Sequence, residues 1–554
     1  MAFSFRVIHE AVRDTSGLSV KQLMNRIARA SLDGSRGNSG AIMAQYFHGF
    51  SEALSNKIRI TAGEFAAASN AGAQAAWTAM SEPVAGTLPT VLEDFSKGLQ
   101  DKVRQGIDDF RGVFEHGLKC ARQSLAGTTE QLPALKRAGV VDAGGQGFVD
   151  LLEGVWTYIQ SGAERLPQLA SDLLSAPAAV DVEMDTDSHR YCTECVIKGD
   201  ALDRAAIMER LQQLDSSSLM VAGGFRRVRV HVHADNPGAV FLACGEFGEI
   251  HQQKADDMQR QHGLMNQPGT VAVVADTGAD IPLEEQERLA IHMVPVRLNF
   301  GDREYIDHVS LQSADLYRML QDCDEMPKTS QPPVGDFSRQ YEMLVSHGYD
   351  VISVGLSELL SGTTQAARTA ALAVGGGRVR VFDSQSASTG QGLLAIMAAE
   401  AARQGMALDE IEILLDRLRR QTRTFAIPAD LSWIVMGGRL PAWIKTLADF
   451  LHIKPVLAEK AGNFSLGGVA TGKGAKPAAL GKVALRNMKK NVSYRVLISH
   501  GANLEGAQAL RHYILRRHGR VHSCRITEAG PALGVHLGPG GLVVGFLPQP
   551  VQLH

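Results

Sequence analysis

The character of the sequence changes near residue 270, and this change limits what the chain can fold into. Up to about residue 165 nearly every segment has helical character, and runs of Val, Ile and Thr are scarce. Beyond Gly269, short apolar strands alternate with helical stretches; they are 271–275, 351–354, 379–382 and 495–499. The first pattern predicts an all-α domain. The second predicts an α/β fold with parallel sheets, so we expect a multidomain protein.

A polar stretch marks a further boundary. Residues 166–190 contain Pro167, Pro177 and an acidic polar run at 181–187, a composition typical of a linker. We therefore expect a helical domain at 1–165, a small middle α/β domain at 191–268 and a larger α/β part at 269–554.

Composition excludes several functional classes. The net charge of −3 offers no basic footprint for nucleic acid. Six cysteines are scattered through 554 residues, which is typical of reduced thiols in the cytoplasm. The amino terminus lacks a signal-peptide pattern, and no apolar run is long enough to span a bilayer. These features predict a cytoplasmic protein without a membrane span.

Three Gly-rich segments interrupt the helical third, at 33–40, 83–88 and 141–147. Such interruptions are usually plain turns between helices. The first is more specific, because Asn38-Ser39-Gly40 leads directly into an expected helix at 41–50. The backbone N–H groups of this turn would face a phosphate.

In this order, the three segments resemble a nucleotide-binding domain that is shared by the catalytic subunit of bacterial fatty acid kinase and the dihydroxyacetone kinase L-subunit. The resemblance covers about residues 15–160 and implies a barrel of antiparallel helices with ATP or ADP at one end. It also implies a homodimer. The residues it assigns to the nucleotide are Asn38, Ser39 and Gly40 by the phosphates, Thr87 over the nucleotide, and Asp142 with Gly144 on the nucleoside side.

The sequence departs from this family at its start. The family begins with an Asn-x-Phe-Pro-Val-Pro-Asp-Gly-Asp-Thr-Gly-Thr-Asn segment whose aspartates hold two Mg²⁺ ions. Nothing like it precedes Asp33, and Asp14-Thr15-Ser16-Gly17 is at most a remnant. Mg²⁺ requires such carboxylates and neutralises charge during phosphoryl transfer. Without those carboxylates we expect weak or absent phosphoryl transfer. Either the chain starts too late, or the domain has lost its chemistry.

The middle domain offers candidate metal ligands. A strand begins at Tyr191-Cys192, a helix is expected at about 202–214, and a second strand at 228–233 carries two histidines. Alternation places His231 and His233 on one face. Two histidines with a cysteine suit Zn²⁺, and the alternative is a surface strand with incidental histidines. Cys192 and Cys195 would face opposite sides of the strand, so at most one of them can be a metal ligand together with the histidines.

Residues 191–258 resemble the middle domain of the catalytic subunit of fatty acid kinase. The resemblance implies that Cys192, His231 and His233 form the metal site. Its implied role is structural or dimer-forming rather than catalytic.

In the carboxy-terminal half, a Ser361-Gly362-Thr363 turn follows an expected strand and opens an expected helix, which is a natural anion site. Other small-polar clusters lie at strand ends or in adjacent loops. They are Asp276-Thr277-Gly278-Ala279-Asp280, Lys328-Thr329-Ser330-Gln331-Pro332, Asp383-Ser384-Gln385-Ser386 and Gly534-Val535-His536-Leu537-Gly538-Pro539-Gly540. Hydroxyls with an imidazole can bind a carboxylate without transforming it.

These clusters, in this order, resemble the motifs of the DegV family of fatty-acid-binding proteins over about residues 271–548. Gly437-Gly438-Arg439 matches a further stretch of that family. The resemblance implies two α/β lobes that bury the acyl chain of a long-chain fatty acid in a tunnel. It assigns the carboxylate to Thr329, Ser361 and His536. Leu360 and Leu537 depart from the usual motif residues, but neither is a ligand.

Two functions follow from these resemblances. The first is fatty acid binding and presentation for ATP-dependent phosphorylation to an acyl phosphate. The second is a non-catalytic cytoplasmic fatty acid carrier with a relic or regulatory kinase-like domain. Either one implies transient membrane contact for lipid exchange. Phosphorylation of a small polyol, as by dihydroxyacetone kinase, is weaker because the separate protein that captures the polyol has no counterpart here.

Overall fold

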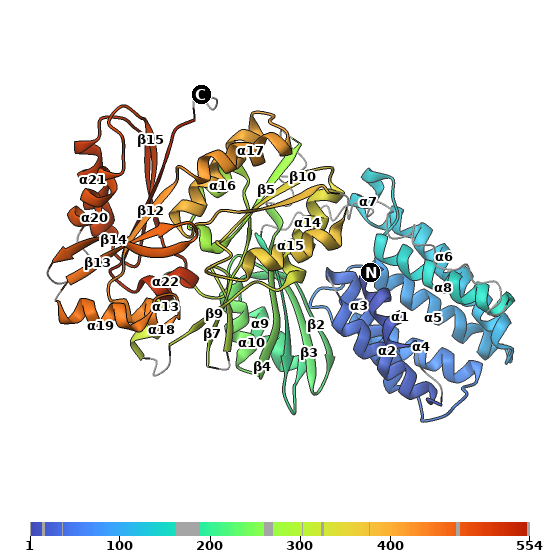
Figure 1. The fold of residues 1–554 in the computed structure, drawn as a ribbon. Coiled ribbons are helices and arrows are strands. Elements are labelled where there is room, and N and C mark those ends of the chain that lie inside the picture. The colour runs from blue at the N-terminus through green and yellow to red at the C-terminus, as the bar shows by residue number, and fades with distance from the viewer. Residues whose placement is uncertain are drawn as a thin grey trace. The chain divides into compact units, whose positions relative to one another are not determined.

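The computed structural model describes residues 2–13, 17–35, 37–161, 189–259, 270–301, 303–322, 326–375, 377–451, 453–471 and 477–550. The chain forms two compact units, Met1–Gln259 and Arg260–His554 (Figure 1). Most of the predicted linker at 166–190, and most of the Asp14-Thr15-Ser16-Gly17 remnant, lie outside the described residues.

The first part of the amino-terminal unit is helical, as predicted. Its helices are α1 (Ala2–Ala11), α2 (Val20–Gly34), α3 (Gly37–Glu52), α4 (Ala62–Trp77), α5 (Leu88–Arg104), α6 (Phe110–Gln131), α7 (Pro133–Ala138) and α8 (Ala143–Ser161). Capping boxes at Ser19 and Thr61 begin α2 and α4, where each side chain accepts a hydrogen bond from a first-turn backbone N–H. Phe95, Phe114 and Phe148 are fully buried between α5, α6 and α8 and hold this bundle together.

The remainder of this unit is a small α/β layer. Strands β1 (Tyr191–Lys198), β2 (Ser216–Gly224), β3 (Arg227–Ala234) and β4 (Glu249–Asp257) form an antiparallel sheet in the order β2-β3-β1-β4. Helices α9 (Arg204–Gln212) and α10 (Pro237–Gly245) connect them. The sheet is joined to the helical part by a β-bridge between Met80 and Met220. Buried Met220 and Ala222 belong to the same hydrophobic core as the helices.

The carboxy-terminal unit contains a parallel four-stranded sheet in the order β11-β10-β5-β6. Its strands are β5 (Val271–Asp276), β6 (His292–Val294), β10 (Asp350–Gly355) and β11 (Val379–Asp383). Alternate residues of β5 face opposite sides. Val271 and Val273 pack with α16 (Thr389–Arg403) and α17 (Leu408–Arg419). Ala272 and Val274 pack with α14 (Val334–Ser346) and α15 (Thr363–Val374).

The second large sheet differs from the predicted parallel arrangement. Its order is β14-β13-β12-β17-β15-β16, and only β15 and β16 run parallel. One cause is a tight hairpin, in which Lys460 pairs with Asn463 and both Ala461 and Gly462 have positive φ. The strands are β12 (Arg423–Ile427), β13 (Ile453–Lys460), β14 (Asn463–Thr471), β15 (Tyr494–His500), β16 (Val521–Glu528) and β17 (Leu542–Pro548).

Smaller elements complete this unit. A three-stranded antiparallel sheet contains β7 (Arg297–Phe300), β8 (Arg303–Ile306) and β9 (Lys328–Ser330). The other elements are η3 (Thr277–Ala279), α12 (Leu283–Leu289), α13 (Ser313–Asp322), α18 (Leu431–Met436), α19 (Ala442–Phe450), α20 (Pro477–Arg486), α21 (Leu504–Arg517) and α22 (Pro531–Leu537). In the described part of the chain, no helix is both long and apolar enough to cross a membrane.

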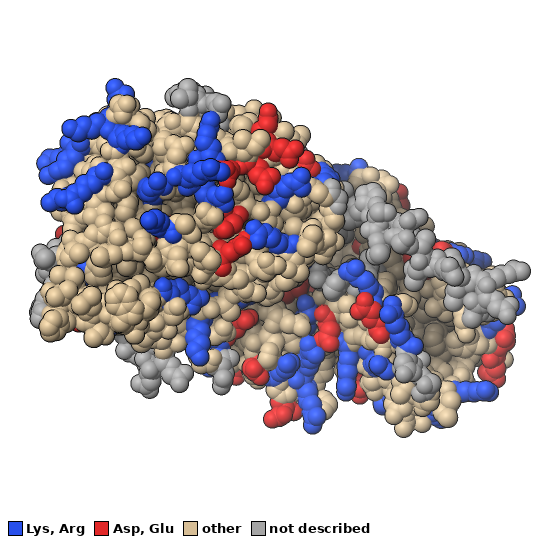
Figure 2. Space-filling view, in the orientation of Figure 1, with Lys and Arg blue, Asp and Glu red and all other residues tan. Residues whose placement is uncertain are grey.

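The overall charge of −3 conceals a local basic surface. Lys and Arg side chains gather over α20 and α21, at the upper left of Figure 2. The exposed basic residues there are Lys482, Arg486, Lys489, Lys490, Arg511, Arg516, Arg517 and Arg520. A whole-chain charge cannot reveal such a patch, because acidic residues elsewhere cancel it.

Candidate functional site

The predicted nucleotide residues lie at the beginnings of three helices that meet at one end of the bundle. The helix that follows the first Gly-rich turn begins at Gly37, so Asn38, Ser39 and Gly40 form the first turn of α3 rather than precede it. A Cβ added to Gly144, in the first turn of α8, would lie 2.7 Å from Ser39 Oγ and 3.2 Å from Leu88 Cβ. The starts of α3, α5 and α8 are therefore in direct contact, and their dipoles add positive potential there.

Asp142 and Thr87 shape this end. Asp142 Oδ2 accepts a hydrogen bond from the backbone N–H of Gly145 at 2.6 Å, which fixes the start of α8. Thr87 is the residue before α5, and its hydroxyl donates to the carbonyl oxygen of Val84 at 2.7 Å. Asn38 Oδ1 is buried without a hydrogen-bond partner in the described part of the chain. The six predicted residues thus share one end of the bundle and include an unsatisfied acceptor.

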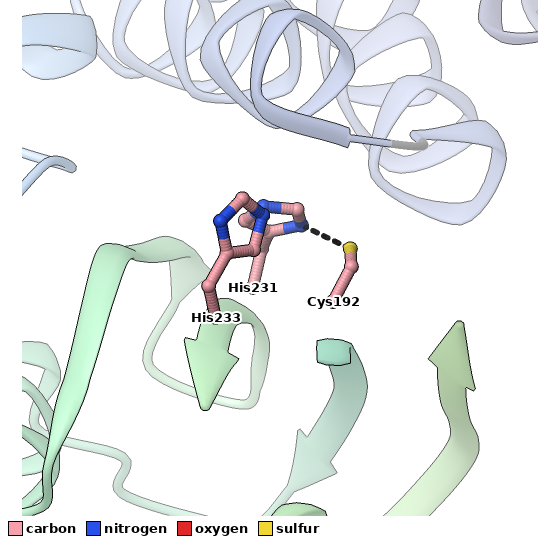
Figure 3. A group of neighbouring side chains, drawn as sticks. All are labelled: Cys192, His231 and His233. Carbon is pink, nitrogen blue, oxygen red and sulfur yellow. Dashed lines mark hydrogen bonds between the residues drawn. The ribbon is translucent and has the colours of Figure 1, made fainter. Parts of the chain in front are cut away.

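Cys192, His231 and His233 come together on one face of the small sheet (Figure 3). One ligand atom from each lies within 4.8 Å of the others. Cys192 stands opposite His233 in the pairing of β1 with β3, and His231 lies two residues earlier on β3. Cys192 Sγ is 3.8 Å from His231 Nδ1. Cys195 faces the other way and is buried against Cys244 of α10, so only one of the two strand cysteines faces the histidines.

These three residues fit a tetrahedral metal such as Zn²⁺. Bonds of about 2.0–2.3 Å require the ligand atoms to lie within about 4 Å of one another, which a small closure would achieve. His231 Nδ1 lies 3.1 Å from Glu194 Oε1, whereas its Nε2 is buried without a partner among the described residues. A neutral imidazole that donates from Nδ1 keeps a lone pair on Nε2. A metal would satisfy that buried lone pair, in the carboxylate–histidine–metal arrangement.

Glu194 is a site residue that the sequence prediction missed. It lies two residues after Cys192, is 1% exposed and contacts both His231 and Arg229. Burial alone would raise the pKa of its carboxyl, but Lys254, His231 and Arg229 hold that pKa well below its usual range. Its place on the same strand face as Cys192 was a signal, although its partners on other elements could not be seen in the sequence.

In the carboxy-terminal unit, two of the predicted carboxylate ligands meet. Thr329 of β9 and His536 of α22 are joined by a hydrogen bond of 3.2 Å between Oγ1 and Nε2. Ser361 does not join this pair among the described contacts, since its hydroxyl bonds to Thr363 Oγ1 at 2.9 Å. A Cβ on Gly362 would lie within 1.9 Å of Gln331 Oε1, so the turn at Ser361 lies against the strand end that carries Thr329.

Two buried aspartates position these loops. Asp276 accepts hydrogen bonds from the backbone N–H of Leu356, which begins the loop leading to Ser361, and from Gln391. Asp280 accepts from Ser499 and from the backbone N–H of Gly530, immediately before α22. Burial raises the pKa of each carboxyl to about 6. The predicted Asp276–Asp280 cluster therefore anchors the segments that lead to Ser361 and His536.

Arg439 adds a positive charge to this region. Its guanidinium donates a short hydrogen bond to the carbonyl oxygen of Gly437. A Cβ on Gly437 would lie 2.4 Å from His536 Nδ1, so this turn packs directly on the imidazole. Burial, with a contribution from Arg439, lowers the pKa of His536 to about 4. His536 is therefore neutral at pH 7, and Arg439 is the nearby cation that would attract an anion.

A cavity of about 330 Å³ opens elsewhere in this unit. It is lined by Glu285, Arg288, Glu400, Arg495 and neighbouring residues, and it contains none of Thr329, Ser361 and His536. Its charged residues are already paired with one another, for example Arg495 with Glu400 at 2.7 Å. The predicted carboxylate ligands therefore lie outside this cavity.

Comparison with known proteins identifies three parts of the chain. Residues 270–549 match the sequence model of the DegV family, which is half of the chain. Residues 1–157 match the DAK2 domain. Residues 188–265 match the FakA-like middle domain, a domain named after fatty acid kinase.

Individual relatives match parts of the chain. A DegV domain-containing protein of Halalkalibacterium halodurans is 32% identical over 274 residues, which is 49% of this chain and 96% of that protein. Protein YloV of Bacillus subtilis is 34% identical over 249 residues, 43% of this chain and 44% of that protein. An uncharacterized protein of Staphylococcus haemolyticus is 32% identical over 265 residues. The match spans about half the length of the last two relatives, 44% and 47%.

Solved structures also resemble part of the chain. A fatty-acid-binding DegV family protein from Thermus thermophilus is 28% identical, with a TM-score of 0.47, and the match covers 50% of this chain and all of that one. DegV of Bacillus subtilis, described as a fatty acid binding protein, is 27% identical with a TM-score of 0.45, over 51% of this chain. From the sequence matches, the chain belongs to the DegV family, and its DegV part follows a DAK2 domain and a FakA-like middle domain.

Proposed function

We propose that the carboxy-terminal unit binds a long-chain fatty acid and holds its carboxylate near Thr329, Ser361 and His536. The observation that carries this proposal is the Thr329–His536 hydrogen bond, with Arg439 beside the imidazole. A hydroxyl, a neutral imidazole and a guanidinium can hold a carboxylate by charge-assisted hydrogen bonds. Family membership and the name of the matched middle domain support fatty acid as the ligand.

Replacing His536 by alanine is expected to weaken fatty acid binding by about tenfold or more. The physical reason is the loss of one hydrogen bond to a charged group, which is worth about 1.5–3 kcal/mol. The measurement is the fatty acid extracted from the purified full-length protein, together with the Kd for added oleate. Thr329→Val should act in the same direction, and His512→Ala, an exposed histidine on α21, is the control. Unchanged binding in both site variants contradicts this assignment.

We further propose that the bound carboxylate is presented to ATP held at the joined starts of α3, α5 and α8. A carboxylate oxygen would attack the γ-phosphorus, forming an O–P bond, while the bond to the bridging oxygen breaks and leaves ADP. The carboxylate is already ionised at neutral pH, so no general base is needed. Positioning and charge neutralisation would supply the catalysis. The contact between Ser39 and Gly144 supports the nucleotide site.

A hydroxylamine trap separates the two functions expected from the sequence. The full chain is incubated with oleate, ATP and Mg²⁺, and acyl hydroxamate is measured. Product formation that falls about tenfold in Ser39→Ala, but not in Ser55→Ala on an exposed loop, supports the kinase. Absence of product, with ordinary oleate binding, supports the alternative of a carrier whose kinase-like domain is a relic or regulator.

Membrane contact for lipid exchange is proposed for α19 (Ala442–Phe450). Trp443, Leu447 and Phe450 lie along one side of this helix and are 65%, 49% and 79% exposed. Lys445 and Asp449 form an ion pair at 2.6 Å on another side. A helix with an apolar face and a charged face can lie in the interface of a bilayer.

A further inference from the structure

The Glu194 carboxylate connects the candidate metal site to the helix that carries the candidate phosphate turn. Its Oε1 accepts a hydrogen bond from the backbone N–H of Gly37 at 3.0 Å and lies 3.1 Å from His231 Nδ1. Gly37 is the first residue of α3, and the next three residues form the turn predicted to meet phosphate. A single oxygen atom therefore lies between a metal ligand and the nucleotide turn.

The second oxygen of Glu194 extends this connection. Arg229 Nη2 donates to Glu194 Oε2 at 3.3 Å, and Arg229 Nη1 donates to the carbonyl oxygen of Leu32 at 3.1 Å. Leu32 lies in the last turn of α2, so the ion pair holds the end of α2 and the start of α3 together. Both side chains are buried: Glu194 is 1% exposed and Arg229 is 8% exposed. Buried charges of this kind are costly to leave unpaired, which restricts where Glu194 can move.

We propose that Glu194 is a positioning residue through which occupancy of the Cys192, His231 and His233 metal site orders the first turn of α3 and tightens nucleotide binding there. A metal on His231 fixes its tautomer and ring orientation and makes the other ring N–H a stronger donor to Glu194. Without the metal the imidazole can turn, and Glu194 Oε1 loses one of its two partners. The nucleotide part of this inference rests on the proposed function, but the ordering of the turn does not.

Hydrogen–deuterium exchange of the full chain tests the ordering without nucleotide. Exchange in peptides that contain residues 37–42 is compared between zinc-loaded protein and protein treated with a chelator, with metal content measured in each. Chelation is expected to speed exchange there about tenfold, the effect of one hydrogen bond to a charged group. Peptides at the start of α5, which does not touch Glu194 in the described contacts, serve as the internal reference. Equal exchange with and without zinc overturns the proposal.

The Glu194→Gln variant tests whether the effect passes through this residue. It retains all three metal ligands but lacks the charge opposite Arg229 and His231. Zinc should still bind, yet its effect on residues 37–42 should fall to less than threefold. Glu249→Gln, an exposed carboxylate on neighbouring β4, is the matched control and should retain the full effect. Undiminished protection by zinc in Glu194→Gln overturns the proposal.

Two histidine variants decide the question even if Glu194→Gln fails to fold or loses zinc. His231→Ala and His233→Ala each remove a metal ligand, and His231→Ala also removes the imidazole that lies 3.1 Å from Glu194 Oε1. With chelator present, both variants should exchange residues 37–42 as fast as the chelated wild type, and added zinc should slow this exchange in neither. Protection of these residues by zinc in either variant contradicts the proposal. An ATP analogue is then titrated into the wild-type protein. If the analogue does not bind, the proposed nucleotide function is refuted, whereas the ordering of the turn is still decided by the exchange results.

Discussion

Gly392→Ala is expected to lower the free energy of unfolding of the DegV part by about 3 kcal/mol, at the upper end for an overpacked core. Gly392 lies in buried α16, and a Cβ there would stand 2.3 Å from the carbonyl oxygen of Ala279. Because that atom belongs to the backbone, no side-chain rotation can relieve the clash. Ala279 lies between Asp276 and Asp280, so the strain would fall on the segment that positions both ligand loops.

Urea unfolding of the full chain checks this, with the transition of residues 270–550 assigned by pulse hydrogen exchange. Gly335→Ala is the matched control in the same unit. Gly335 is exposed in the first turn of α14, and its added Cβ would meet only Arg339 Nη1, at 3.6 Å. That change should be neutral or stabilise the unit by about 0.5 kcal/mol. If Gly392→Ala behaves like its control, the close contact between α16 and Ala279 is wrong.

Glu459→Gln is expected to make the DegV part more stable above pH 7 and to flatten its pH dependence. Glu459 is buried on β13, where Ser386 donates a short hydrogen bond to its Oε2. Its Oε1 has no partner in the described part of the chain. Burial raises the pKa of this carboxyl from its ordinary value of 4.5 to about 8. The folded protein therefore holds a proton that the unfolded chain releases.

The sign follows from that proton. The stability contributed by the protonated Glu459 carboxyl is fully present below about pH 4.5. It falls by about 1.4 kcal/mol for each pH unit as the pH rises to about 8. A glutamine cannot ionise, so its advantage should grow across the same interval to several kcal/mol. Urea unfolding at a series of pH values from 4.5 to 8.5 measures this, with exposed Glu342→Gln on α14 as the control. Parallel curves for Glu459→Gln and wild type would falsify the assignment.

Local sequence patterns predicted individual strands and the faces that their side chains occupy. The strand at 351–354 and the histidine pair on one strand face were visible, because alternation and helix periodicity are properties of short segments. The order of β12, β13 and β17 could not be predicted, because antiparallel pairing between segments far apart in the chain produces no pattern within either segment. The parallel sheets expected throughout the carboxy-terminal half were therefore only half right.

The site divides in the same way. Thr329 and His536 came from motifs and do lie together, 207 residues apart in sequence. Glu194 and Arg439 were missed as site residues, although each lies within or beside a segment that the sequence had marked. Their importance comes from what they touch, namely Gly37 for Glu194 and His536 for Arg439. Contacts of this kind depend on how segments far apart in the chain pack together, and this packing cannot be predicted from one sequence.

The β-bridge between Met80 and Met220 has a consequence for modularity. The sequence suggests that the helical part could be excised at the linker near residue 166, as a self-contained domain. Yet Gly223 of β2 donates its backbone N–H to Gln45 in α3 at 2.7 Å, and the backbones of Ala79 and Val221 are hydrogen-bonded at 2.9 Å. Cutting there would expose buried polar groups on both pieces. Residues 1–259 are thus the smallest piece to transplant between relatives, and the linker joins two halves of one folding unit.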